Sequence, residues 1–210
     1  KIMTRIYLTR HGETEWNRQK RFQGSKNSEL TEKGILAAEL LASRVEEIDL
    51  DCIISSPLKR AYQTAEIVRG NKGIDIVKCD GFKEINLGDF EGMRWDEIED
   101  LHGDVLNKIT DDPFDNRYPN GENLMEFYNR VENSLREIIE KFRDKSVLIV
   151  AHGGTINCIL SYFRGVKINK NWMGHVAENC SLSCFEVNKA GVREIFFNDT
   201  EHLRGITAYN

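Results

Sequence analysis

Two histidines occupy corresponding places in the sequence, each closing a short apolar run and each followed by glycine. His11 stands in the triplet Arg-His-Gly at 10–12, and His152 opens the run His-Gly-Gly at 152–154. Parallel strands gather their carboxyl ends at one edge of a sheet, where ligands bind. Glycine lets a ligand approach the backbone, and Gly153 leads into a predicted helix whose first N–H groups favour an anion. The alternative is two unrelated core histidines, but the equivalent positions favour a shared anion site.

A cation and a carboxyl group could complete such a site. Arg60 falls in the first turn of a helix predicted to begin at Pro57, where the helix dipole disfavours a cation by about 0.3–1 kcal/mol. A nearby anion would compensate, although a solvated surface arginine is the alternative for this residue taken alone. Glu84 follows the third predicted strand and could reach the same edge; by itself it carries little information.

These residues are far apart in the sequence, and a parallel sheet would bring them together. Short apolar runs rich in β-branched residues are typical of strands buried on both faces. Such runs cover residues 6–9, 52–55, 74–77 and 147–151. Helical periodicity follows the N-cap candidate Thr31 as far as Ile48. A second and longer helix is predicted over 122–142, where the helical period is unbroken.

The carboxyl-terminal part predicts a hairpin, with strands at 182–187 and 192–197 that add antiparallel pairing. The fold class predicted is therefore α/β, a three-layer α/β/α sandwich with a mostly parallel central sheet. Residues 1–210 are expected to form a single domain. The acidic, least periodic segment 93–120 holds two of the three prolines and is predicted to form a small cap outside the sheet that sets substrate specificity. The polar tail 204–210 is expected to be loosely ordered.

Composition excludes several classes of protein. A net charge of −5 argues against a general nucleic-acid binder. The longest apolar run, 147–151, falls far short of the roughly 18 residues of a membrane span, and the N-terminus does not resemble a signal peptide. The five cysteines are odd in number and mostly lie in apolar segments, which favours reduced thiols and a cytoplasmic location. Their spacing predicts no metal site.

Together these segments resemble the histidine phosphatase superfamily, the phosphoglycerate-mutase-like enzymes. The resemblance spans roughly residues 5–187 and rests on five blocks in the family's order. The blocks are Leu-Thr-Arg-His-Gly-Glu-Thr at 8–14 with Trp16 and Asn17, Ser-Ser-Pro-Leu-Lys-Arg-Ala at 55–61, Glu84 with Gly88, Glu91 and Gly92, Pro119 with Gly121 and Glu122, and Ala-His-Gly-Gly at 151–154.

The resemblance implies a role for each residue. His11 would accept the phosphoryl group and must be neutral to attack; repulsion by Arg10 and Arg60 helps to keep it so. The two arginines and His152 would bind the phosphoryl oxygens, and Glu84 would protonate the leaving oxygen and later deprotonate water. No metal or other cofactor is implied. Further phosphate or substrate contacts would come from Asn17, Gln23, Gly24 and Gly153.

Three functions are compatible with these blocks. The residues after Glu84 and after Gly24 are similar to the phosphatase branch, and the acidic segment 96–115 offers little to bind a second phosphate, so a phosphatase is favoured. The alternatives are a phosphoglycerate mutase and a binding module without turnover, the latter disfavoured because every catalytic position is filled. We expect a small phosphorylated molecule as the only partner, with no nucleic acid or membrane, and a monomer or homodimer.

The identity of the substrate is open between sugar phosphates, phosphoserine, cobalamin nucleotide-loop precursors and phosphoglycerate. Five cap residues could contact an apolar leaving group or simply pack the cap against the sheet. They are Trp95, Ile98, Leu101, His102 and Phe114. His175 and His202 are assigned to surface or packing roles.

Overall fold

A computed structural model describes residues 3–207 of the chain. The strands are β1 (Thr4–Arg10), β2 (Cys52–Ser55), β3 (Asp75–Lys78), β4 (Ser146–Ala151), β5 (Leu182–Asn188) and β6 (Gly191–Asp199). The α-helices are α1 (Glu15–Arg18), α2 (Glu32–Glu46), α3 (Lys59–Arg69), α4 (Trp95–Asp111), α5 (Leu124–Lys141), α6 (Gly153–Arg164) and α7 (Arg204–Thr207), and short 3-10 turns lie at Asp80–Phe82, Gly88–Phe90 and Glu201–Leu203.

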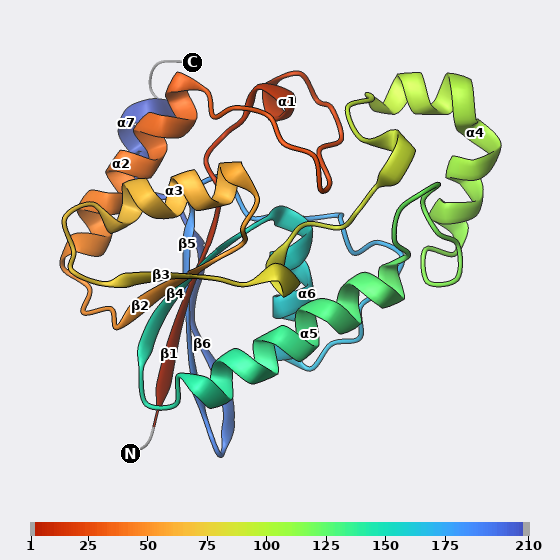
Figure 1. The fold of residues 1–210 in the computed structure, drawn as a ribbon. Coiled ribbons are helices and arrows are strands. Elements are labelled where there is room, and N and C mark those ends of the chain that lie inside the picture. The colour runs from red at the N-terminus through yellow and green to blue at the C-terminus, as the bar shows by residue number, and fades with distance from the viewer. Residues whose placement is uncertain (1–2, 208–210) are drawn as a thin grey trace.

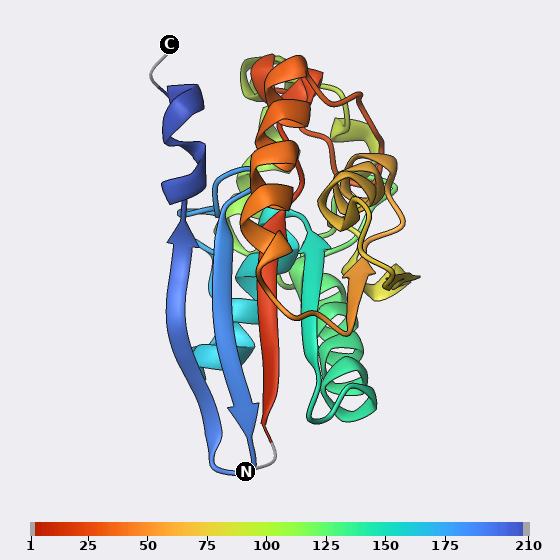
Figure 2. The same ribbon diagram turned by 90° about the vertical axis from the view of Figure 1, so that its left-hand side faces the viewer.

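The strands form one mixed sheet in the order β3-β2-β4-β1-β5-β6. The first four strands in this order are parallel, whereas β5 and β6 add antiparallel pairs. The predicted α/β class, the mostly parallel sheet and the closing hairpin are confirmed. In Figure 2, α2 passes in front of the strands and α6 behind them, as expected for three layers.

The period of two along the strands explains the layers. Ile6 and Leu8 of β1 pack with α5 and α6, whereas Tyr7 between them packs with α2 and α3 on the other face. Because both faces are covered, the central strands must be apolar at consecutive positions. β3 is different: it pairs only with β2, and its residues are exposed or half-buried. The prediction that 74–77 is buried on both faces is therefore wrong, since an edge strand is open on one side.

Local signals position the helices closely but not perfectly. Thr31 caps α2 as predicted, with its hydroxyl accepting from the N–H of Gly34 at 3.0 Å. Helix α5 lies within the predicted range 122–142. Helix α3 begins at Lys59 rather than Pro57, because Leu58 still has extended backbone (ψ 133°). Arg60 nevertheless remains in the first turn.

Segment 93–120 contains a long helix that its irregular pattern had concealed. Helix α4 is kinked at His102, whose φ and ψ are −140° and 25°, and it lies beyond the carboxyl ends of the strands (Figure 1). Ile98 and Leu106 pack with Phe90 in a small core of their own. The kink breaks the 3.6-residue period, which is why the pattern did not predict a helix.

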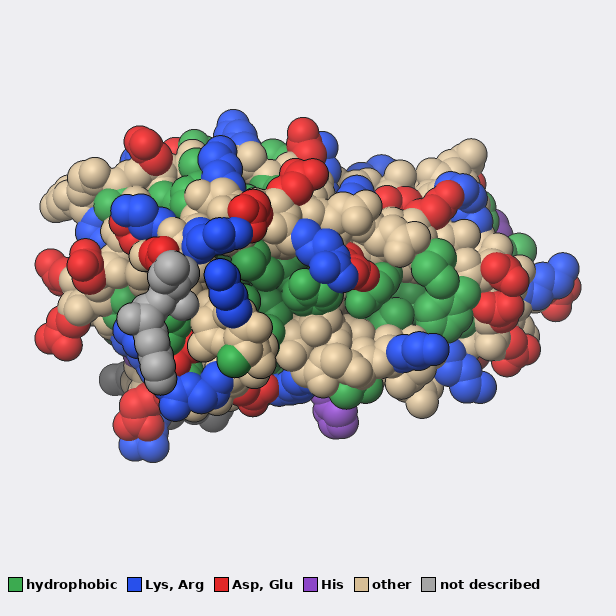
Figure 3. All heavy atoms as spheres, turned by 90° about the horizontal axis from the view of Figure 1, so that it is seen from below, with side chains coloured by type: hydrophobic (Ala, Val, Ile, Leu, Met, Phe, Trp, Pro, Cys, Tyr) green, Lys and Arg blue, Asp and Glu red, His purple; other side chains and the backbone are tan. Residues whose placement is uncertain are grey.

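The face seen from below in Figure 3, at the amino ends of β1 and β4, carries interspersed acidic and basic side chains. Lys145 and Asp51, which directly precede β4 and β2, form an ion pair. Between residues 3 and 207 there is no helix with the length and apolarity that crossing a membrane requires. The tail expected to be loose forms α7 over 204–207, and residues 208–210 lie outside the described part of the chain.

Candidate active site

The carboxyl ends of β1 and β4 place the two histidines side by side. Arg10 pairs with Ala151 in the parallel register, and the N–H of His11 donates to the Ala151 carbonyl at 3.0 Å. The imidazole rings of His11 and His152 are consequently 5.2 Å apart between centroids, and both side chains are buried. Strand pairing therefore brings together two residues that are far apart in the sequence.

The hydrogen bonds of His11 define its tautomer. Its Nδ1 lies 2.7 Å from the carbonyl oxygen of Gly12, which can only accept, so Nδ1 carries the proton and Nε2 the lone pair. Burial holds the pKa of His11 well below its usual value, and the charges of Arg60 and Arg10 lower it further. Burial is the larger cause, whereas the sequence suggested only the arginines. A buried, neutral imidazole with its lone pair on Nε2 is a competent nucleophile.

Arg60 is fully buried and joins His11 to the loop at 24–27. Its Nε donates toward Nε2 of His11 at 3.3 Å, and its two terminal nitrogens donate to the carbonyls of Lys26 at 2.6 Å and Gly24 at 2.7 Å. The backbone N–H of Arg60 donates to the side-chain oxygen of Asn27 at 3.0 Å. Burial lowers the pKa of Arg60 to about 10. Three of its five N–H donors are thus engaged by protein, which leaves fewer for a ligand than sequence analysis implied.

Arg10 enters the site from the end of β1. One terminal nitrogen donates to the Ala177 carbonyl at 3.1 Å, whereas its buried Nε has no hydrogen-bond partner within residues 3–207. Asn179, from the same segment, donates to the carbonyl of His11 at 2.7 Å. Sequence analysis missed these two supports, because a backbone carbonyl and a loop asparagine form no recognisable motif.

His152 sits behind His11 and is held by Ser56. Its Nε2 lies 2.7 Å from the Ser56 hydroxyl, which also accepts from the N–H of Leu58 at 3.3 Å. The hydroxyl still has its proton and a second lone pair, so it can donate to Nε2 or accept from it. Nδ1 of His152 is buried and, among the residues described, has no hydrogen-bond partner. Burial, followed by the charge of Arg60, holds the pKa of His152 well below its usual value.

Glu84 lies at the amino end of α6. One carboxylate oxygen accepts from the N–H of Gly154 at 2.9 Å and the other from the N–H of Ile85 at 3.1 Å. The helix that follows His152 therefore holds the carboxyl group that sequence analysis placed after the third strand.

Two predicted contact residues, Asn17 and Gln23, also organise the loop in which they lie. The Asn17 side-chain oxygen accepts from the backbone N–H of Thr14 at 3.1 Å, which caps α1. The side-chain oxygen of Gln23 accepts from the hydroxyls of Thr14 at 2.8 Å and Ser28 at 3.1 Å. These bonds orient both amides and use their oxygens, so the amide nitrogens are the atoms suited to donate to an anion.

The two predicted glycines are required by close packing. Gly24 has a positive φ of 53°, and a β-carbon there would lie 2.3 Å from a carboxylate oxygen of Glu91. A β-carbon at Gly153 would lie 2.2 Å from Cγ1 of Val176. The space at Gly153 is thus taken by the protein itself, whereas the sequence suggested room for a ligand.

A cavity of about 190 Å³ opens over His11. Eight of the nine predicted site residues line it: Arg10, His11, Asn17, Gln23, Gly24, Arg60, Glu84 and Gly153. The ninth, His152, lies deeper. Arg21 also lines the cavity, but it is bonded to Glu97 and to the carbonyl of Gly92. No group of three or more His, Cys, Asp or Glu suited to a metal ion occurs in the described part of the chain.

The outer wall of the cavity is apolar and was largely missed by sequence analysis. It consists of Phe22, Ile85, Leu87, Tyr118, Trp172, Met173 and Val176. The five cap residues considered for this role are absent from the lining: Trp95 and Leu101 are 50% and 70% exposed, and Ile98 packs inside the cap. His175 is exposed, and His202 bonds to the carbonyl of Cys180 at 2.8 Å, away from the cavity.

Comparisons with known proteins identify the family of the chain. The sequence pattern of the histidine phosphatase superfamily (branch 1) matches residues 6–200. The chain is 31% identical over 201 residues to "Phosphoserine phosphatase 1" of Hydrogenobacter thermophilus, covering 96% of this chain and 95% of the relative. It is 34% identical over 183 residues to "Probable phosphoglycerate mutase GpmB" of Escherichia fergusonii, and the match covers 86% of this chain and 84% of that relative.

The solved structure of Bacillus stearothermophilus YhfR superposes with a TM-score of 0.88 at 33% identity, covering 96% of this chain and all of that one. Fold and sequence pattern thus agree over nearly the whole chain. The protein belongs to branch 1 of the histidine phosphatase superfamily.

Proposed function

We propose that this protein is a phosphatase that hydrolyses a small phosphomonoester through a phosphohistidine on His11. The observation that carries the proposal is the position of His11, whose Nε2 bears the lone pair and lies 3.3 Å from Nε of Arg60, in a cavity that Arg10 and Glu84 also line. A neutral nucleophile, two cations and a carboxyl group are the parts that phosphoryl transfer requires.

The phosphoryl group would be bound by donors that lack protein partners. Nε of Arg10 and Nδ1 of His152 are both buried without a hydrogen-bond partner in the region described, and an orphaned buried polar group is costly. In the proposed arrangement the Ser56 hydroxyl donates to Nε2 of His152, and Nδ1 carries the imidazole proton. A phosphoryl dianion supplies acceptors for both, and the remaining N–H groups of Arg60 add positive charge.

The reaction then runs in two steps. Nε2 of His11 attacks phosphorus and the ester P–O bond breaks, while Glu84 gives its proton to the departing alcohol oxygen. Water next attacks the phosphohistidine and loses its proton to the same carboxylate. The P–N bond breaks, which releases inorganic phosphate and returns neutral His11 and protonated Glu84. No metal ion takes part.

The apolar wall favours hydrolysis over mutase chemistry. A mutase must hold a second charged phosphate, but among the described lining residues the cations are Arg10, Arg60 and Arg21. The first two face the phosphoryl site, and Arg21 is engaged by Glu97 at 3.1 Å. The alcohol that fits the rest of the wall is uncharged and carries apolar surface.

The test is chemical trapping in the presence of EDTA. We expect the purified chain to hydrolyse p-nitrophenyl phosphate. Quenching without acid should trap the phosphoryl group as a base-stable, acid-labile label, which mass spectrometry should place on His11. His11→Asn should abolish label and turnover, whereas His175→Asn, at an exposed position, should alter neither. A label on serine or on His152, or activity lost with EDTA, would contradict the proposal. Phosphoglycerate isomerisation dependent on bisphosphoglycerate would support the mutase instead.

A further inference from the structure

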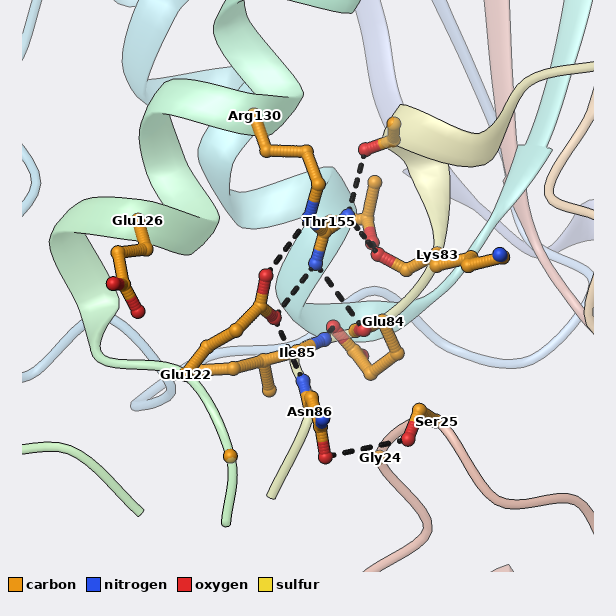
Figure 4. A network of polar contacts seen from close by, with 12 residues as sticks. Gly24, Ser25, Lys83, Glu84, Ile85, Asn86, Glu122, Glu126, Arg130 and Thr155 are labelled. Atoms are coloured by element: carbon orange, nitrogen blue, oxygen red, sulfur yellow. Dashed lines mark hydrogen bonds and ion pairs between the residues drawn. The ribbon is translucent and has the colours of Figure 1, made fainter. Parts of the chain in front are cut away.

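A partly buried network of polar contacts surrounds the segment that carries Glu84 (Figure 4). At its centre is Arg130 of α5. One terminal nitrogen of Arg130 donates to the carbonyls of Gly81 at 3.0 Å and Lys83 at 2.9 Å, and the other approaches the carbonyl of Glu84 at 3.5 Å. The same guanidinium bonds Glu122 in a fork, at 2.9 and 2.8 Å. Arg130 therefore contacts the backbone on the amino-terminal side of the Glu84 side chain.

Glu122 holds the other side of the same segment. Its carboxylate accepts from the N–H of Asn86 at 2.8 Å. The Glu84 carboxylate accepts from the N–H of Gly154, in the first turn of α6, at 2.9 Å. The pair thus clamps the backbone before and after Glu84 without touching the carboxyl group itself.

The segment has little other regular support. Between β3 and α4 it forms only two short 3-10 turns, so no ladder of strand or α-helix hydrogen bonds fixes its position. Additional contacts come from the Thr155 hydroxyl, which is 3.3 Å from the carbonyls of both Phe82 and Lys83. Side chains from α5 and α6 therefore substitute for a regular backbone pattern at the residue where position matters most.

The charges of the pair are also matched to this task. An unpaired guanidinium beside Glu84 would compete for its carboxylate and draw it out of the cavity. Glu122 occupies Arg130 with two hydrogen bonds and cancels its charge, and both side chains are largely buried, at 27% and 21% exposure. Arg130 can therefore donate hydrogen bonds to the backbone carbonyl oxygens while the carboxylate of Glu84 remains at the cavity.

We propose that Arg130 and Glu122 are positioning residues for proton transfer: they hold the backbone of 81–86 so that the Glu84 carboxyl reaches the oxygen of the departing alcohol. The inference rests on the proposed function, because it assumes that Glu84 is the proton donor. Misplacement by about 1 Å can cost about 100-fold in rate, and a general acid contributes about 10²–10⁴-fold. The loss should appear only where the leaving group needs a proton.

The test compares two leaving groups. Nitrophenolate departs without a proton, whereas the alkoxide of hexyl phosphate does not. We expect Arg130→Met to lower kcat/KM for hexyl phosphate about 10- to 100-fold and for p-nitrophenyl phosphate less than about 3-fold. Glu122→Gln should lower the ratio of kcat/KM for hexyl phosphate to kcat/KM for p-nitrophenyl phosphate as well, but by a smaller factor. Arg130→Lys should be intermediate, since an ammonium cannot reproduce the fork, and it keeps the test valid if the methionine variant does not fold.

Glu186→Gln is the matched control. Glu186 is also a buried carboxylate bonded to two arginines, Arg5 at 2.7 Å and Arg193 at 3.0 Å, but it lies in β5 and does not line the cavity. Its loss should lower the melting temperature and leave the ratio of the two kcat/KM values unchanged.

Two results would overturn the inference: equal losses on both substrates in all the Arg130 and Glu122 variants, or no loss on either. The wild-type chain separates this from failure of the proposed function. If wild type forms the His11 label and Glu84→Gln shows the alkyl-selective defect, but the pair variants do not, only the positioning role fails. If wild type forms no label, the proposed function and the inference fall together.

Discussion

Removing the hydroxyl of Ser56 should impair phosphoryl transfer at His11, although Ser56 does not line the cavity. The hydroxyl lies 2.7 Å from Nε2 of His152, and in the proposed arrangement it donates to Nε2 and so keeps the imidazole proton on Nδ1. In Ser56→Ala, Nε2 is buried with no donor, and the alternative tautomer becomes accessible. Nδ1 would then turn a lone pair toward the phosphoryl oxygens.

The size of the effect follows from the cost of one unsatisfied buried group. Leaving such a group without a partner costs about 1–3 kcal/mol, and each 1.36 kcal/mol is a factor of ten in rate. If this cost falls on the binding of the phosphoryl group in the transition state, kcat/KM should drop about 5- to 160-fold. The N–H of Leu58 also loses its acceptor, so stability should fall by about 1 kcal/mol.

The assay is kcat/KM for p-nitrophenyl phosphate, together with urea unfolding and ¹⁵N NMR of the imidazole nitrogens. Ser55→Ala is the matched control, because Ser55 is equally buried but its hydroxyl donates to the carbonyl of Ser56 at 2.8 Å. The control should lose comparable stability and little activity. The reasoning is refuted if the two variants have equal activity, or if NMR shows that His152 in Ser56→Ala keeps its proton on Nδ1.

Three further predictions follow from the same geometry. Burial depresses the pKa values of His11 and His152 in the folded state, so their contribution to stability is complete above about pH 6.5 and is lost as the pH falls toward the depressed values. Urea unfolding should show the free energy of unfolding declining by up to about 1.4 kcal/mol per pH unit for each histidine, and the decline should be smaller in His152→Gln. Gly153→Ala should raise KM, since the new β-carbon meets Val176, and Val176→Ala in the same chain should restore it; additive losses in steady-state kinetics would argue against this contact. The apolar wall predicts a kcat/KM at least about tenfold higher for hexyl phosphate than for phosphoserine, with Trp172→Ala narrowing the gap; a preference for phosphoserine would refute the uncharged alcohol.

Much of the fold could be predicted from short stretches of sequence. Continuous apolar runs identified the central strands, and the period of 3.6 identified α5, because both patterns reflect which faces of an element are covered. The same reasoning misjudged β3, since an apolar run does not reveal whether a second neighbour pairs with the strand. It also missed α4, whose kink at His102 breaks the period.

The sequence by itself determined that His11 and His152 each follow the carboxyl end of a strand, and that Arg60 and Glu84 were candidates to join them, because motifs and strand ends are local features. That the two strands are neighbours is a result of the sheet topology. Only the tertiary structure decided which atoms meet. The bond from Ser56 to His152 joins residues 96 positions apart, and that from Asn179 to His11 joins residues 168 apart. Such contacts leave no periodic trace in either segment, since they depend on how the helices and loops pack around the sheet rather than on the conformation of neighbouring residues. The contact between Arg60 and Nε2 of His11, the unpartnered buried nitrogens of Arg10 and His152 and the apolar wall of the cavity all arise from that packing.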